Sequence, residues 1–356
     1  MEKYSVIGLM SGTSLDGLDI AHCVLILENG KWKYTIRSAQ TLLYHHDWKQ
    51  RLAGAPALRG IDLSLLSKEY GRFIGKTVLA FARKHHVRPL FIASHGHTVF
   101  HQPDKKITMQ IGDGASIAAE MGIPVVCDFR TLDVALGGQG APLVPMGDKL
   151  LFSEYTACLN LGGIANISYE EEGERIAFDI CPVNIILNEL ANKLGKAYDS
   201  KGHFARSGKL NEEMLAKLNV LPFYRVKPPK SLGKEWLTKY FIPIIDSFDI
   251  STEDKLRTVT EHAAKQIGKV FGHIHSETPV SVLVTGGGAF NDFLVERMRS
   301  YTQANIVIPE KELVMFKEAL IFAFLGVLRW RNEVNTLRSV TGASHDSSGG
   351  CIYLAK

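Results

Sequence analysis

The sequence lacks a long hydrophobic run, a signal segment and paired cysteines. Its longest apolar run, residues 319–328, is about half of the ~20 residues that a membrane helix needs, so we expect a buried helix and no membrane contact. The N-terminus has no basic segment followed by an apolar core, which indicates a cytoplasmic protein without a secretory signal. The five cysteines are scattered, with no CxxC pair, so we expect neither disulfides nor structural zinc.

An excess of one charge sign is also missing. The 41 basic and 37 acidic side chains are interspersed and leave a net charge of +4, with no basic stripe that could follow a nucleic-acid backbone. We therefore expect no nucleic-acid partner. The 356 residues, 46% of them hydrophobic, suffice for about two domains that each bury an apolar core.

Hydrophobic periodicity and turn residues predict one order of elements twice, with turns at Asn29–Gly30 and Glu172–Gly173 between the second and third strands of each half. The first half has strands at 4–10, 18–27 and 32–36, a helix at 61–86, a strand at 90–94, a helix at 115–121 and a strand at 123–127. The second half has strands at 157–161, 164–169 and 175–178, a helix at 185–194, a strand at 280–284, a helix at 290–301 and a strand at 306–308. Paired α/β domains are indicated, with a ligand where the loops of the halves converge.

The repeat sets the expected domain boundaries. We expect a first domain at 1–130, with the C-terminal segment 338–356 packing back on it. The second domain is expected at 131–337, with a helical insertion at about 210–266.

Glycine-containing loops are candidates for nucleotide binding. MSGTSLDGLD at 10–19 combines bare backbone, hydroxyls and carboxylates, which suits phosphate and Mg²⁺, although an ordinary polar turn explains it equally well. NLGGIANIS at 160–168 occupies the matching hairpin of the second half, and VTGGGAFND at 284–292 is either an adenosine site or a tight strand-to-helix turn. The candidate residues are Gly12, Thr13, Ser14, Asp16, Gly17, Asp19, Gly162, Gly163, Gly286, Gly287, Gly288 and Asn291, with Asp16 and Asp19 as ligands of Mg²⁺, directly or through water.

Asp179 and a histidine cluster are further candidates. Asp179 ends a predicted strand close to Asn184 and can serve as a general base, or as a strand-end aspartate or helix cap. His95, His97 and His101 have no cysteine or acidic cluster to complete a zinc site, so substrate hydrogen bonding or loop packing explains them.

A series of motifs in order resembles the anhydro-N-acetylmuramic acid kinase family, a branch of the superfamily of acetate and sugar kinases, heat-shock ATPases and actin. The motifs are GLMSGTSLDGLD at 8–19, SHGHTVFHQP at 94–103, IGDGASIA at 111–118, DFRTLDVALGGQGAPLVP at 128–145, NLGGIANIS at 160–168, YDSKGHFARSG at 198–208, PPKSLGKEW at 228–236, VTGGGAFN at 284–291 and SVTGAS at 339–344. They span nearly the whole chain.

The resemblance implies a duplicated actin-like, ribonuclease H-like α/β fold, with two domains that each contain a mixed sheet flanked by helices around a central cleft. It implies a phosphotransferase of cell-wall recycling and amino-sugar metabolism. Such an enzyme uses ATP and Mg²⁺ to open 1,6-anhydro-N-acetylmuramic acid with water and phosphorylates O6, giving N-acetylmuramic acid 6-phosphate. A homodimer is expected by analogy alone.

The resemblance also implies roles for single residues. Asp179 matches the family's base, which activates the attacking water, and Glu318 matches a glutamate that approaches the sugar, although Glu318 also suits a helix N-terminal acid. The candidate sugar-binding residues are His95, His97, Asp128, Arg130, Gln139 and Asn184.

The chain departs from the family pattern in two places. FDTGPGN is replaced by FDICPVN at 178–184, which introduces Ile180, Cys181 and Val183, and His97 stands where glutamine is usual. Two alternatives therefore stay open. One is a kinase of the same fold for another sugar, and the other is a nucleotide-driven binding module without sugar kinase activity.

Overall fold

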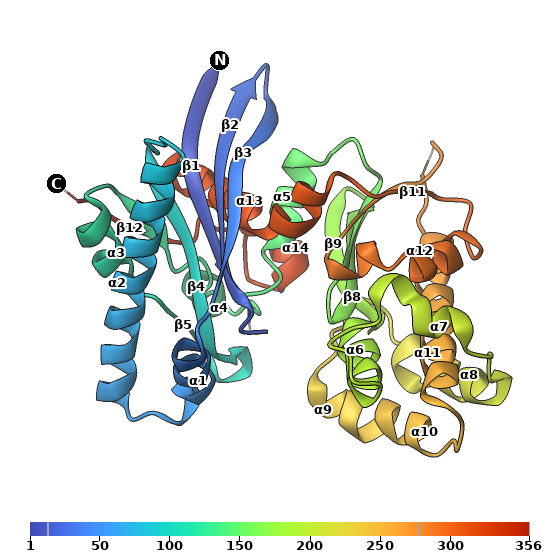
Figure 1. The fold of residues 1–356 in the computed structure, drawn as a ribbon. Coiled ribbons are helices and arrows are strands. Elements are labelled where there is room, and N and C mark those ends of the chain that lie inside the picture. Colours follow the sequence, from blue (N-terminus) through green and yellow to red (C-terminus); the bar gives the residue numbers. More distant parts are fainter. Residues whose placement is uncertain (13, 277, 356) are drawn as a thin grey trace. The chain divides into compact units, whose positions relative to one another are not determined.

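The chain folds into two compact units, each built on one β-sheet. The structure, a computed structural model, describes every residue except 13, 277 and 356 (Figure 1). Unit 1 comprises residues 1–151 and 316–356, and unit 2 comprises residues 152–315.

The sheet of unit 1 is mixed. Its strand order is β12-β6-β4-β1-β2-β3, with β5 paired to β4. Strands β1 to β3 form an antiparallel meander, and β4 and β6 continue it in parallel with β1. The strands are β1 (Glu2–Ser11), β2 (Gly17–Glu28), β3 (Lys31–Leu43), β4 (Phe91–Gln102), β5 (Ile107–Ile111), β6 (Val125–Cys127) and β12 (Cys351–Tyr353).

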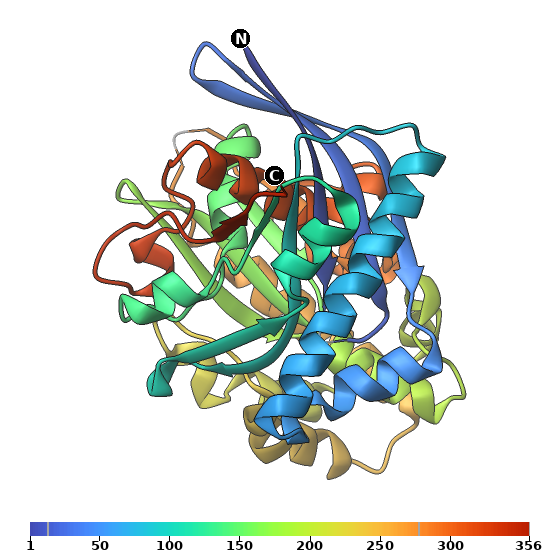
Figure 2. The same cartoon turned by 90° about the vertical axis from the view of Figure 1, so that its left-hand side faces the viewer.

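Helices cover both faces of this sheet, as Figure 1 and Figure 2 show for α2 and α13. Alternate residues of β1 point to opposite faces. Ile7 and Leu9 share a core with α2, whereas Gly8 abuts Ala319 of α13. The helices are α1 (His46–Gly54), α2 (Gly60–Lys84), α3 (Gly114–Met121), α4 (Thr131–Ala135), α5 (Val144–Leu151), α13 (Lys311–Trp330), which enters unit 1 at Phe316, and α14 (Arg338–Thr341).

The sheet of unit 2 repeats the same plan. Its order is β11-β10-β7-β8-β9, with an antiparallel meander followed by two parallel strands. The strands are β7 (Ala157–Leu161), β8 (Ile164–Glu171), β9 (Glu174–Pro182), β10 (Ser281–Thr285) and β11 (Asn305–Val307). The helices are α6 (Asn184–Lys193), α7 (His203–Ser207), α8 (Glu212–Asn219), α9 (Lys234–Trp236), α10 (Ile242–Asp246), α11 (Thr252–Phe271) and α12 (Asp292–Arg299).

The predicted α/β fold, with two mixed sheets flanked by helices, is confirmed. Each meander is closed by the predicted hairpin turn, in which both residues have positive φ: 51° and 74° at Asn29 and Gly30, and 51° and 83° at Glu172 and Gly173. The apolar run at 319–328 is buried within α13, as expected. Of the helices in the described part of the chain, none combines the length and the hydrophobicity that crossing a membrane requires.

Two local predictions for unit 1 are incomplete. The expected strand at 90–94 continues to Gln102, because it forms a hairpin with β5, which the periodicity did not indicate. Helix α1, between β3 and α2, was also not predicted. The histidine motif therefore lies on a strand, with a left-handed φ of 74° at Gly96.

The compact units end at other residues than the expected domains. Residues 131–151 and 316–337 belong to unit 1, not to the second half. The physical reason is packing: α5 contacts β3, and Gly326 of α13 lies against Ala93 of β4.

Gly8 provides a test of the close contact between α13 and β1. A Cβ at Gly8 would lie 1.9 Å from the Ala319 carbonyl oxygen, so we expect Gly8→Ala to destabilise unit 1 by about 2–3 kcal/mol through overpacking. Urea denaturation measures the change. Gly54→Ala is the matched control, since no atom lies within 4 Å of its added Cβ. Equal stability of the two variants would contradict the packing argument.

Candidate functional site

The first glycine loop of unit 1 joins β1 to β2. Gly17 is required by packing, because its Cβ would lie 2.4 Å from the Leu42 carbonyl oxygen. Gly12 has room, with Ser14 Oγ as the nearest atom at 3.5 Å, and Ser14 and Asp16 are exposed. Thr13 lies outside the described residues. Gly12, Ser14 and Asp16 thus leave backbone and oxygen atoms accessible to a ligand.

Asp19 is the second carboxylate of this loop region. It is half-buried, and its Oδ1 accepts a hydrogen bond from Thr41 Oγ1 at 2.5 Å. Burial raises the pKa of Asp19, the Thr41 hydroxyl lowers it, and Asp16 raises it. Across the residues that the structure describes, no three His, Cys, Asp or Glu side chains form a metal-binding group. Two carboxylates fit Mg²⁺, which binds proteins through few carboxylates together with water and phosphate.

His95 and Arg130 form a buried pair in unit 1. The His95 Nδ1–H donates to the Gly96 carbonyl at 2.9 Å, so Nε2 accepts the Arg130 Nε–H, also at 2.9 Å. Burial lowers the pKa of His95 well below its usual range, which keeps the ring neutral. Burial also lowers the pKa of Arg130, to about 10, so the guanidinium is charged at neutral pH and held in one orientation.

The GGQG loop is fastened beside Arg130. Arg130 Nη1–H donates to the Gly140 carbonyl at 2.6 Å. The buried Asp133 carboxylate accepts hydrogen bonds from the Gly140 N–H and the Thr341 hydroxyl, both at 2.7 Å. Gln139 is held through its own N–H, which donates to the Thr341 carbonyl, and its side chain is exposed. Gln139 is therefore available to a ligand.

Asp128, which directly follows β6, and His97 on β4 are two further candidate residues of unit 1. Asp128, with a positive φ of 59°, accepts a hydrogen bond from the Thr131 hydroxyl. His97 is buried on β4, and its Nδ1 lies 3.2 Å from Ser11 Oγ.

Glu318 lies on α13, next to a buried ion pair. Lys317 Nζ and Asp148 Oδ1 are 2.7 Å apart, which fixes this turn of the helix. The Glu318 residue is exposed in part, yet many protein atoms surround its carboxyl group. The resulting loss of hydration raises the pKa of Glu318. Arg130 lowers the same pKa and Asp19 raises it, so both lie within electrostatic reach of Glu318 in unit 1.

Asp179 is held by backbone groups of unit 2. Its N–H donates to the Lys230 carbonyl at 3.0 Å, and its Oδ2 accepts the Leu232 N–H at 2.8 Å. Burial raises the pKa of Asp179, and the Leu232 hydrogen bond lowers it. The helix-cap alternative is wrong, because Val183 is the N-cap residue of α6 and no side chain caps this helix.

Sequence reasoning missed the segment at 230–232. Its motif was visible, but a Pro- and Gly-rich loop gives no periodicity from which its contact with β9 could be inferred. Lys230 is anchored there: its Nζ donates to the Phe223 carbonyl at 3.3 Å and lies 4.6 Å from the centre of the Phe223 ring.

Asn184 positions the second glycine loop. Its Nδ2–H₂ donates to the carbonyls of Leu161 and Gly162 at 3.0 and 2.8 Å. The N–H groups of Val183 and Ile185 donate to the Gly163 carbonyl at 2.9 and 3.1 Å. The start of α6 is thus tied to the NLGG loop.

The third glycine loop contains glycines of two kinds. Gly286, with φ of 82°, and Gly288 are required by packing, since their Cβ atoms would lie 2.5 Å from Asn160 Oδ1 and 2.8 Å from Leu161 Cβ. Gly287 has no atom within 4 Å of an added Cβ, so its bare backbone is open to a ligand. Asn291 caps α12 by accepting the Leu294 N–H at 3.0 Å.

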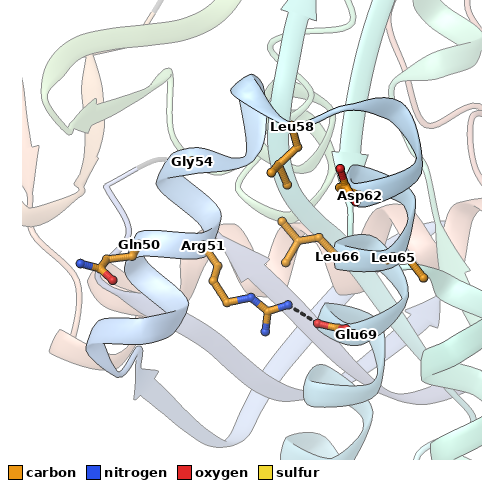
Figure 3. Close-up of a pocket in the computed structure, with 8 residues that line it drawn as sticks. All are labelled: Gln50, Arg51, Gly54, Leu58, Asp62, Leu65, Leu66 and Glu69. Atoms are coloured by element: carbon orange, nitrogen blue, oxygen red, sulfur yellow. Dashed lines mark hydrogen bonds and ion pairs between the residues drawn. The ribbon is translucent and has the colours of Figure 1, made fainter.

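A surface pocket of about 440 Å³ lies elsewhere in unit 1, between α1 and α2 (Figure 3). Arg51 forms an ion pair with Glu69 across it. None of the candidate residues lines this pocket.

The chain is similar to known proteins over nearly its whole length. The family model described as anhydro-N-acetylmuramic acid kinase matches residues 4–355. The chain belongs to this family. The anhydro-N-acetylmuramic acid kinase of Vibrio cholerae is 36% identical over 99% of this chain and 99% of its own length, and that of Methylobacterium nodulans is 34% identical over 97% and 98%. A solved activator of 2-hydroxyisocaproyl-CoA dehydratase from Clostridium difficile aligns over 90% of this chain and 94% of its own, with 13% identity and a TM-score of 0.41.

Membership of the anhydro-N-acetylmuramic acid kinase family makes the chain a phosphotransferase, as predicted. The binding-module alternative is not favoured. The unusual FDICPVN segment is explained by packing in unit 2, where Ile180, Cys181 and Val183 all lie in the hydrophobic core. Their side chains therefore pack away from solvent, while Asp179 remains half-buried.

Asn184 tests the link between α6 and the NLGG loop. We expect Asn184→Ala to cost about 1–3 kcal/mol of stability, because the Leu161 and Gly162 carbonyls each lose the hydrogen bond that Asn184 Nδ2 donates. Thermal unfolding measures the loss. Asn192→Ala, on the exposed side of α6, is the control and should change stability by less than about 0.5 kcal/mol. A similar loss in both variants would show that the loop does not depend on Asn184.

Proposed function

We propose that this kinase opens 1,6-anhydro-N-acetylmuramic acid with water and transfers the γ-phosphoryl group of ATP to O6, giving N-acetylmuramic acid 6-phosphate for cell-wall recycling. The family match over residues 4–355 supports the substrate. The geometry of Asp179 is the observation that carries the mechanism.

Asp179 is assigned as the general base. One carboxylate oxygen, Oδ2, is fixed by the Leu232 N–H, and Oδ1 has no hydrogen-bond partner among the residues that the structure describes. Burial raises the pKa of this carboxylate, which makes it a stronger base towards water. In the proposed reaction, Oδ1 takes one proton from the water that attacks the anomeric carbon.

The sugar is assigned to polar groups of unit 1 and to Asn184 of unit 2. Arg130 offers an oriented cation, Gln139 an exposed amide and Glu318 a carboxylate that can accept a sugar hydroxyl. His95, His97 and Asp128 are also assigned to sugar binding. Asn184 is assigned an indirect role, because it holds the NLGG loop in place through its hydrogen bond to the Gly162 carbonyl.

ATP is assigned to the glycine loops. In unit 1 the residues are Gly12, Thr13, Ser14, Asp16, Gly17 and Asp19, and in unit 2 they are Gly162, Gly163, Gly286, Gly287, Gly288 and Asn291. Asp16 and Asp19 would hold Mg²⁺, directly or through water, and the ion would neutralise phosphate charge. Gly12, Gly163 and Gly287 support this assignment, because packing does not require their lack of a side chain.

We also propose a cytoplasmic location, where ATP is available, and a homodimer by analogy with similar kinases. Light scattering of the purified chain tests the dimer, and a monomer at micromolar concentration would contradict it.

The central experiment uses ¹⁸O water. Purified protein with ATP, Mg²⁺ and the anhydro sugar should yield a product that carries both phosphate and one ¹⁸O atom, detected by mass spectrometry. Asp179→Asn should lower the rate about 10²- to 10⁴-fold, because the amide cannot accept the proton. Asp249→Asn, an exposed aspartate of unit 2, is the control. Phosphorylation of other amino sugars only would identify a different substrate.

The pH profile tests Asp179 as the base. Activity requires the ionised carboxylate, so kcat/KM should fall as pH drops through the raised pKa of Asp179. Leu232→Pro removes the N–H that favours ionisation, so we expect the acid limb to move to higher pH. Leu232→Ala keeps the N–H and loses the side chain, so its limb should stay in place. If the acid limb moves equally in both variants, the titrating group is not Asp179.

A further inference from the structure

A chain of buried hydroxyl groups runs from α2 to His97 in unit 1. The hydroxyl oxygens of Tyr70 and Tyr44 are 2.5 Å apart. The Tyr44 hydroxyl donates to Ser11 Oγ at 2.8 Å, and Ser11 Oγ lies 3.2 Å from His97 Nδ1. All four residues are buried. The chain therefore ends on a candidate sugar-binding residue.

The direction of each hydrogen bond follows from counting protons. Tyr44 has one hydroxyl proton and donates it to Ser11, so it accepts from Tyr70. Ser11 accepts on the tyrosine side, and a buried hydroxyl also donates its own proton. The Tyr70 hydroxyl is also within hydrogen-bond reach of Ser11. Because the Tyr70 proton is donated to Tyr44, we assign the Ser11 proton to His97 Nδ1, a nitrogen acceptor 3.2 Å away. The ring proton of neutral His97 then resides on Nε2.

The two histidines of the motif therefore carry opposite tautomers. His95 has its proton on Nδ1 and accepts from Arg130 at Nε2. His97 accepts at Nδ1 and presents an Nε2–H, which has no hydrogen-bond partner in the part of the chain that the structure describes. Burial lowers the pKa of His97 and so favours the neutral ring.

We propose that Tyr70, Tyr44 and Ser11 are positioning residues that hold His97 in its Nε2–H tautomer, and that this N–H recognises an uncharged acceptor oxygen of the sugar. The proposal rests on the proposed function and adds a specificity device to it. An N–H donor at this place distinguishes sugars that offer an oxygen there from sugars that lack one, because the unpaired donor is left buried in the second case.

Nitrogen NMR of the full chain tests the tautomer directly. With ¹⁵N-labelled histidine, and with His97→Gln to assign the signals, wild-type His97 should show a pyridine-like Nδ1 and a pyrrole-like Nε2. Tyr44→Phe combined with Tyr70→Phe should move the two shifts towards each other, because Ser11 then loses both tyrosine hydroxyls and can accept from the His97 ring. Tyr353→Phe, at the exposed strand β12, is the matched control and should leave them in place. A pyrrole-like Nδ1 in the wild type overturns the proposal.

A double-mutant cycle tests the function of the tautomer. Tyr44→Phe should raise KM for the anhydro sugar about fivefold, the size expected for one neutral hydrogen bond, and leave KM for ATP unchanged. Glutamine has an N–H donor that needs no tautomer, so in a His97→Gln background Tyr44→Phe should raise KM less than about twofold. Equal effects in both backgrounds overturn the proposal.

The two experiments separate this inference from the proposed function. A wild-type protein that phosphorylates no anhydro sugar contradicts the proposed function and the sugar contact together, whereas the spectrum still decides the tautomer. If the enzyme forms the expected product but the His97 proton resides on Nδ1, only the proposed role of Tyr70, Tyr44 and Ser11 is contradicted. Melting temperatures of Tyr44→Phe and Tyr353→Phe exclude misfolding, since both keep their aromatic ring.

Discussion

The close packing of α13 on the sheet of unit 1 is the constraint on which the candidate site residues of this unit depend. Backbone meets backbone at Gly8, where an added Cβ would lie 1.9 Å from the Ala319 carbonyl oxygen, and Gly326 meets Ala93 with a corresponding distance of 2.6 Å. Contacts this short allow α13 only one register against strands β1 and β4. Because Glu318 directly precedes Ala319, its place relative to β1 and β4 is fixed by the same contact.

Charge in unit 1 is arranged within this packing. The sheet presents Asp19 from β2 and His95 from β4, and the segment after β6 presents Arg130. Arg130 lowers the pKa of Glu318, whereas Asp19 raises it, so both groups influence the protonation of Glu318. Neutral His95 orients the guanidinium without adding a second positive charge.

The sequence predicted the helices and strands that have strong periodicity. It predicted few of the contacts between side chains. Both meanders, their hairpin turns and α2 were visible because alternation and positive-φ residues are local signals. Strand β5 was missed because its pairing with β4 is decided by tertiary context. The burial of Ile180, Cys181 and Val183 could not be predicted from the sequence either. A residue that replaces a glycine can pack in the core or face a ligand, and the sequence alone does not distinguish the two.

Packing divides the glycines of the loops into two kinds, which a sequence motif does not distinguish. Gly17, Gly286 and Gly288 are excluded from having a Cβ by neighbouring atoms, so their presence is explained by the fold alone. Gly12 and Gly287 have space for a side chain and ordinary backbone angles, so the fold does not explain them. A bare backbone that packing does not require is what a phosphate or a ribose needs for close approach. The nucleotide assignment therefore rests on the glycines that the protein could structurally do without.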